Sequence, residues 1–134
     1  MQINSRGVGL IVALGVIMLI ISLALLAVNF TLSNFKLFNY TINTIKAFTF
    51  AEAGIQRSMY KIKNGTPNSE SWDFSGQTIA ITIDPPTPVN TYNVTSIGPY
   101  RPYSNVTKTI SAKVALDTTT TPNKVILLEW KQKD

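Results

Sequence analysis

Few side chains in this 134-residue sequence could perform chemistry. It contains no cysteine and no histidine, which excludes disulfides, thiol nucleophiles, imidazole acid–base catalysis and Cys/His metal sites. Ser96 and Ser104 therefore have no base to activate them. The carboxylates of the second half are scattered and lack the spacing of a metal-binding loop or of a general acid and base: Asp73, Asp84, Asp117 and Glu129. We expect no enzyme activity, no metal and no cofactor.

Basic side chains are in excess, with 12 Lys and Arg against 7 Asp and Glu. Interleaved tyrosines and Trp130 are compatible with a surface that binds DNA or another polyanion. A solubilising strand face, with lysines that keep edge strands from aggregating, explains the same pattern more simply. Nucleic acid is therefore the weaker interpretation. The proline-flanked loop that contains Tyr100, Arg101 and Tyr103 is the best candidate for contact with a partner.

Charge is missing from one part of the chain. Charged residues make up only 14%, against roughly 25% in soluble domains. No ionisable side chain lies between Arg6 and Lys36. Within this gap, Val8–Val28 is interrupted only by two glycines and one serine, and its 21 residues span about 31 Å as a helix. This length matches the hydrocarbon core of a bilayer and predicts a transmembrane helix.

Three interpretations of this apolar segment compete. A cleaved secretory signal is disfavoured, because the apolar run is too long and no small-x-small cleavage site precedes a polar change. The second interpretation is an ordinary single-pass anchor. The third is a pilin-type segment from which only the short polar leader is removed. The residues at the start of the run decide between the last two.

Helical periodicity continues beyond Val28. No proline occurs from Asn29 to Lys63, and Gly65 and Pro67 then supply a stop signal. The apolar residues are spaced mostly three or four apart, as on one helix face: Phe35, Phe38, Ile42, Ile45, Phe48, Ile55, Met59 and Ile62. We predict one helix from Val8 to Lys63, apolar all round in its first half and amphipathic in its second. A small domain cannot bury so long a helix, so its first half should lie in lipid or among similar helices.

The second half of the chain favours strands. Polar and apolar residues alternate in three segments, Thr78–Asp84, Thr91–Ile97 and Val106–Leu116. Lys124–Lys131, which follows the polar loop at Thr118–Asn123, is expected to be the last of four strands. Gly98–Ser104 is expected to be a turn-rich connector. The inward positions of the third segment should be Val106, Ile110, Ala112, Val114 and Leu116. We predict an α+β fold, in which a small antiparallel β-sheet packs one face on the helix stripe at Ile45–Ile62.

Two motifs on the predicted helix resemble those of a known family. Arg6-Gly7, followed at once by the apolar run, looks like the class III leader of type IV pilins and type II secretion pseudopilins. The opening RGVGLIVAL is closest to the RGVALIVAL of PilX-type minor pilins. The later segment AFTFAEAGI, which starts at Ala47, resembles the A-x-x-x-A-E-A-G-[IL] pattern of the same proteins. The resemblance covers roughly the first half of the chain.

This resemblance implies processing and assembly. Prepilin peptidase would cut between Gly7 and Val8 and methylate the new N-terminus at Val8. The chain would then comprise a leader (1–7), a transmembrane or filament-core helix (8–28), its amphipathic continuation (29–63) and a C-terminal β domain (64–134). The implied protein is a non-enzymatic subunit of a pilus or secretion filament. Its implied partners are the membrane, prepilin peptidase and other pilin or pseudopilin subunits.

The resemblance also implies a cellular location and indicates whether the protein is a major or a minor subunit. The protein would cross the cytoplasmic membrane once, N-terminus inside, and would reach the cell surface if assembled. Major pilins usually carry Phe and Glu where this chain has Val8 and Val12. In the family, a missing Glu at this place marks tip or initiating subunits, so a minor subunit is favoured. The alternative is a single-pass anchored binding module outside the cytoplasm that keeps its leader and never polymerises.

The second half of the helix carries the residues expected to pack on the sheet or contact a neighbouring subunit: Phe48, Ile55, Met59 and Ile62. Glu52 falls on the same stripe, where it either meets a partner subunit or snorkels out from the edge as an ordinary carboxylate, and we favour the second interpretation. Gly54, next to Ala53 and near Ala51, would let the sheet or another helix approach closely.

Overall fold

The computed structural model describes residues 5–86, 89–100 and 106–133, with side chains from Val8 onward. It divides into two compact units, residues 1–39 and 40–134, which we call unit 1 and unit 2. Each unit is described by itself below.

Helix α1 runs from Ser5 to Lys63, so it starts three residues before the predicted Val8 and ends at the predicted residue. Its end is a Schellman motif. Gly65 adopts a φ of 73°, the N–H of Gly65 donates to the carbonyl of Ile62, and the N–H of Thr66 donates to that of Lys61. Glycine tolerates this left-handed conformation, which explains why the helix stops here.

Unit 1 consists of the first part of α1. Every described side chain from Val8 to Asn39 is exposed, and most of these side chains are apolar. Two hydroxyls of unit 1 bond within the helix: the Ser22 hydroxyl donates to the carbonyl of Met18, and the Thr31 hydroxyl to that of Ala27, both at 2.8 Å. Such hydroxyls need no partner from water.

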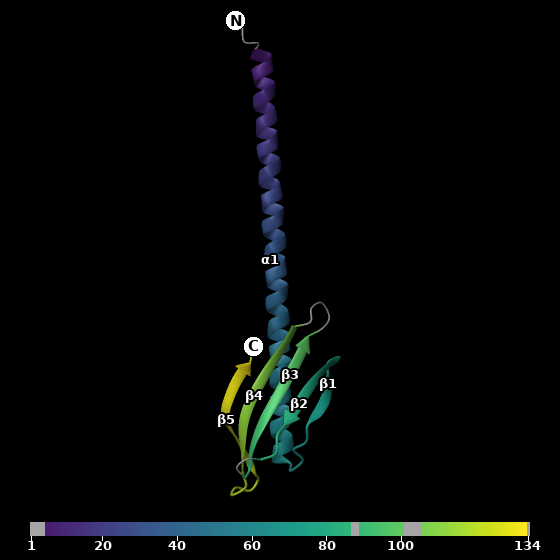
Figure 1. Ribbon diagram of the computed structural model, residues 1–134, viewed down its shortest axis with the longest axis vertical. Helices are drawn as coiled ribbons and strands as arrows, with labels where there is room; N and C mark the ends of the chain where they lie inside the picture. The colour runs from purple at the N-terminus through teal and green to yellow at the C-terminus, as the bar shows by residue number, and fades with distance from the viewer. Residues whose placement is uncertain (1–4, 87–88, 101–105, 134) are drawn as a thin grey trace. The chain divides into compact units, whose positions relative to one another are not determined.

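Unit 2 contains a five-stranded antiparallel meander in the order β1-β2-β3-β4-β5 (Figure 1). The strands are β1 (Glu70–Phe74), β2 (Gln77–Ile83), β3 (Thr91–Tyr100), β4 (Val106–Asp117) and β5 (Lys124–Lys133). The last part of α1 covers one face of this sheet. The predicted α+β class, with a helix packed on a small antiparallel sheet, is thus confirmed.

Two strand predictions are wrong. β1 is missing from the prediction, because its sequence ESWDF is short and partly acidic and alternates over only four residues. It forms a hairpin with β2 through Ser75 and Gly76, both of which have positive φ. β3 extends to Tyr100, three residues into the predicted connector. It pairs with β2 only from Val94 to Ile97, so Pro99, which lacks an N–H, interrupts no hydrogen bonds on that side.

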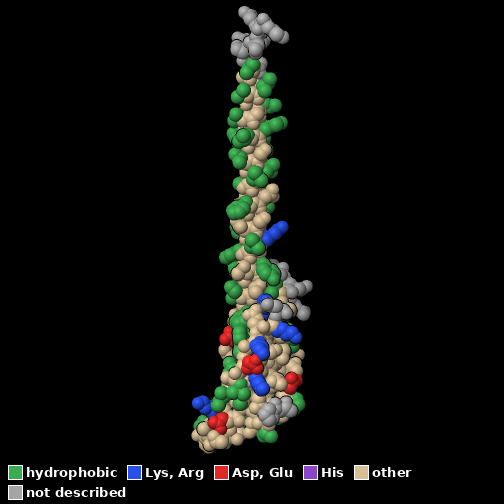
Figure 2. Space-filling view, turned by 60° about the vertical axis from the view of Figure 1, so that its left-hand side comes forward, with side chains coloured by type: hydrophobic (Ala, Val, Ile, Leu, Met, Phe, Trp, Pro, Cys, Tyr) green, Lys and Arg blue, Asp and Glu red, His purple; other side chains and the backbone are tan. Residues whose placement is uncertain are grey.

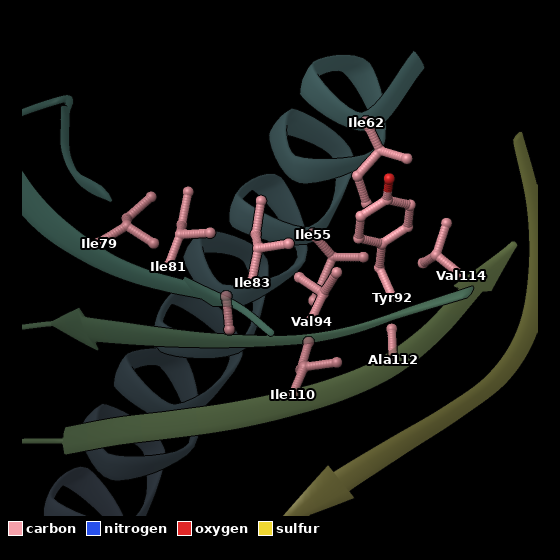
Figure 3. Packing of buried hydrophobic residues seen from close by; sticks show 11 residues of the cluster. Ile55, Ile62, Ile79, Ile81, Ile83, Tyr92, Val94, Ile110, Ala112 and Val114 are labelled. Carbon is pink, nitrogen blue, oxygen red and sulfur yellow. The ribbon is translucent and has the colours of Figure 1, made fainter. Parts of the chain in front are cut away.

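The core lies between α1 and the inner face of the sheet. Figure 3 shows Ile55 and Ile62 of α1 directed at side chains of β2, β3 and β4. Of the inward positions predicted on β4, Ile110, Ala112 and Val114 are buried, whereas Val106 and Leu116 are half-buried.

The buried face of α1 differs from the predicted stripe. Ile45 is 60% exposed, and the earlier stripe members Phe35 and Phe38, in unit 1, are exposed as well. From Ala47 to Ser58, the fully buried positions are occupied by the small residues Ala47, Ala51 and Ser58. Hydropathy periodicity gives weight to large side chains, but the sheet approaches the helix where side chains are small.

Candidate functional site: assembly surface and helix–sheet contact

The surface of unit 1 is the largest apolar surface in the described part of the chain. Leu10 is 72% exposed, Ile11 73% and Phe30 70%. On the face shown in Figure 2, hydrophobic side chains follow one another along unit 1 with one basic side chain among them. By length and composition, one described helix could cross a membrane, and it is compatible with a single-pass anchor. This surface can exchange lipid for other apolar helices, because both environments are similarly apolar.

The predicted cleavage position lies in the first turns of α1. The helix begins at Ser5, so both Gly7 and Val8 have helical backbone. The side chain of Val8 is 48% exposed and that of Val12 is 59% exposed. Neither side chain carries a charge.

Helix α1 approaches β3 closely at a contact of small residues. A Cβ added to Gly54 would meet the Ser96 hydroxyl oxygen far inside van der Waals contact, and would lie 2.9 Å from Ile79 Cγ2. A Cβ added to Gly98 would collide with backbone atoms of Ala47 and Ala51. We call the residues Ala47, Ala51, Gly54, Ser96 and Gly98 the small-residue seam. Gly54 thus lies against the sheet.

The large residues predicted for packing flank or extend the small-residue seam. Ile55 is 4% exposed and Ile62 is fully buried in the core. Phe48 and Met59 are half-buried at its edge, and the Phe48 ring meets Trp130 edge-on at 5.7 Å between centroids. Glu52 is exposed, so it lies outside the buried face of α1. An exposed carboxylate here needs no partner within unit 2.

An ion cluster that the sequence analysis did not identify joins α1 to β1. Arg57 and Lys61, one turn apart on α1, both form ion pairs with Glu70 of β1. The Arg57 guanidinium also stacks 4.7 Å from the Trp72 ring centroid. The pKa of Glu70 is lowered, chiefly by its hydrogen bond with Arg57, which outweighs the opposing effect of burial. The i, i+4 spacing of the two cations could have indicated an ion cluster on this face of the helix. Their carboxylate partner, however, lies on a strand that was not predicted.

The predicted partner loop falls partly within the sheet. Tyr100 ends β3, half-buried, and its hydroxyl accepts a hydrogen bond from Lys46 Nζ at 2.9 Å. Its ring stacks on Phe50 at 6.2 Å, and Phe50 in turn meets Phe74 edge-on. Tyr100 therefore has a packing role on the α1 side of the sheet. Arg101 and Tyr103 lie outside the described residues.

The scattered carboxylates serve local structure. Asp73 accepts a hydrogen bond from the Thr78 hydroxyl at 2.6 Å, and Glu129 pairs with Lys131 on the same strand. Asp117 caps the turn after β4, and hydrogen bonds from the Thr119 hydroxyl and N–H lower its pKa. Within the described ranges, no three His, Cys, Asp or Glu side chains come together as a metal site would require.

Comparison of the chain with protein-family models, with curated protein sequences and with solved structures finds no match in any of the three.

Proposed function

We propose that this protein is a minor pilin or pseudopilin, a non-enzymatic subunit of a type IV pilus or a type II secretion-like filament. One observation carries the proposal: a continuous helix with an exposed apolar first part, in which Lys36 is the one charged residue from Val8 to Asn39, and a second part packed on a sheet. Such a helix needs a partner over its whole first part. Copies of the same helix can supply this partner, in exchange for lipid.

The proposed mechanism begins with processing. Prepilin peptidase removes residues 1–7 by cutting between Gly7 and Val8, and Val8 is then methylated. The helix next leaves the bilayer sideways and packs among helices of other subunits. Val12 brings no charge into this apolar environment, so the helix is held in lipid without the cost of a buried carboxylate. This property favours a tip or initiating subunit. The pilin-type junction at Gly7-Val8 favours an orientation with the N-terminus inside and unit 2 outside the cytoplasm.

The experiment is mass spectrometry of the N-terminus in protein from membranes and from sheared surface material. A start at Val8, with or without a methyl group, is expected. A Gly7→Val variant should keep Met1, because a side chain would clash where the peptidase reads the backbone. The matched control is Gly9→Val, where an added Cβ has no atom within 4 Å among the described residues.

The rival function predicts a different outcome. A single-pass anchored binding module would keep Met1 and would be found only in membranes. That result would overturn the pilin proposal. Presence of the Val8 form in sheared material would separate a filament subunit from a primer that stays in the membrane.

A further inference from the structure

Several lysines lie at the end of unit 2 that contains Tyr40, its first residue. We call this end of the unit the Tyr40 end. Lys46 Nζ reaches the Tyr100 hydroxyl at the end of β3. Lys108 pairs in register with Gly98, two residues from that end. Thr109 of β4 pairs in turn with Lys133 of β5. The sheet register therefore brings Lys46, Lys108 and Lys133, from three separate elements, to the same end of unit 2.

Carboxylates of the described residues lie away from this lysine group. Glu129 is four residues back along β5 and already pairs with Lys131. Asp73 is on β1, the opposite edge strand, where it accepts a hydrogen bond from Thr78. Glu52 lies on α1, six residues beyond Lys46. Among the described residues, the β3–β5 side of the Tyr40 end therefore carries more basic than acidic side chains.

Apolar and aromatic side chains lie among these lysines. Ile45 is 60% exposed and, with Thr44, Phe48 and Gln132, lines a shallow groove between α1 and the end of β5. Trp130, 42% exposed, packs on Phe48 beside this groove. Tryptophan and lysine side chains that flank an apolar segment are typical of the membrane interface.

The apolar run also continues up to this end of the unit. Beyond Val28, the exposed side chains include Phe30, Leu32, Phe35 and Phe38, and Lys36 is the one ionisable residue among them. From Val8 to Phe38 a helix rises about 46 Å, close to the roughly 40–45 Å of a bilayer with its head groups. Lys36 can snorkel to the interface. Tyr40 would then follow at head-group level.

We propose that the Tyr40 end of unit 2 binds the anionic phospholipid head groups of the membrane that holds unit 1. Lys46 and Lys133 contact lipid phosphates, while Ile45 and Trp130 lie at the interface. Lys46 has three donor hydrogens, so its bond to Tyr100 leaves others for phosphate. The inference rests on membrane anchoring, which the proposed function and its rival share, and does not depend on leader cleavage or polymerisation.

The test uses the full chain in vesicles, with Trp72→Phe so that Trp130 is the one tryptophan and can be excited selectively. Vesicles contain phosphatidylcholine alone or with phosphatidylglycerol, plus a lipid with a nitroxide-labelled head group as quencher. Quenching of Trp130 should be stronger in the anionic vesicles and should fall when salt is added. Because each lysine contributes to attraction by an anionic surface, the ratio of bound to free unit 2 should fall about 25-fold in K46Q/K133Q.

The matched control is K63Q/K124Q, which removes two exposed lysines from the other end of unit 2. It should leave the lipid dependence unchanged, and both variants should unfold in urea at the parent's midpoint. The proposal is overturned if Trp130 is quenched equally in vesicles with and without phosphatidylglycerol. It is also overturned if K46Q/K133Q and K63Q/K124Q lose the same share of lipid-dependent quenching. So does a K46Q/K133Q variant that loses affinity for a DNA duplex while its lipid-dependent quenching stays intact, because the partner would then be nucleic acid.

Discussion

The small-residue seam predicts that one methyl group at Gly98 destabilises unit 2. An added Cβ at this position would overlap the carbonyl oxygen of Ala47 and the amide nitrogen of Ala51, and would lie 2.9 Å from Ala51 Cα. All three atoms belong to the backbone of a packed helix, so none can rotate away. The overlap can be relieved only if α1 and β3 move apart, which loosens the core between them.

The magnitude follows from two opposing effects. Overpacking of a well-packed core costs about 1–3 kcal/mol, and a rigid backbone obstacle favours the upper part of that range. Replacement of a strand glycine by alanine recovers roughly 0.5–1 kcal/mol of unfolded-chain entropy. Gly98→Ala should therefore lower the free energy of unfolding by about 2 kcal/mol. For a unit of this size, the melting temperature falls by about 8–16 °C.

The assay is urea unfolding of the full chain in detergent micelles, followed by tryptophan fluorescence. Both tryptophans, Trp72 and Trp130, belong to unit 2 and so report on its unfolding. Gly54→Ala is the matched control. Its added Cβ meets side-chain atoms of Ser96 and Ile79, which can move, and alanine gains about 1 kcal/mol of helix propensity. Gly54→Ala should therefore lose less stability than Gly98→Ala.

The reasoning also predicts which variant a second change rescues. Ser96→Ala removes the hydroxyl nearest to the new methyl of Gly54→Ala, so the double variant should regain stability. The same change should not rescue Gly98→Ala, whose obstacles are backbone atoms. Parent-like unfolding of Gly98→Ala, or equal rescue of both variants, would refute the close approach of α1 to β3.

Three further predictions concern unit 2, each checked by urea unfolding. Glu70→Gln should cost about 1 kcal/mol at neutral pH, since its two cations lose their partner. Because the pKa of Glu70 is lowered in the folded state, this stabilisation is complete above the carboxyl's ordinary pKa and is lost as pH falls through the lowered value. The free energy of unfolding of Glu70→Gln should therefore depend less on pH than that of the parent in this acid range. Glu52→Gln, at an exposed site, should stay within about 0.5 kcal/mol of the parent. Ile62→Ala should cost about 2–5 kcal/mol, whereas Ile45→Ala, 60% exposed, should cost less than about 0.5 kcal/mol.

Local patterns in the sequence were sufficient for the helix and for most strands. The end of α1 at Lys63 follows from Gly65, which alone can take the left-handed conformation there without strain. The alternation from Val106 onward identified the buried positions of β4 around Ala112. These features depend on neighbours within a few residues, so they can be predicted from a single sequence.

Contacts between distant segments were not predictable in the same way. The local signal for β1 is short, with Trp72 and Phe74 before a Ser-Gly turn, and the strand is stabilised by its hairpin with β2 and by cations on α1. Tyr100 was assigned to a loop, since its stacking partner Phe50 is far away in the chain. Sequence periodicity could not identify either contact.

Hydropathy and turn residues act locally, so they suffice to predict the long apolar helix, its amphipathic continuation and the β-rich C-terminal half. The buried face of α1 depends on contacts with the sheet. Periodicity favoured large side chains such as Ile45, and the small residues Ala51 and Gly54 indicated a close approach, but Ala47 and the facing residues of β3 were identified only in the structure. Two backbones approach most closely where side chains are smallest, and only the facing strand, with Ser96 and Gly98, specifies that place.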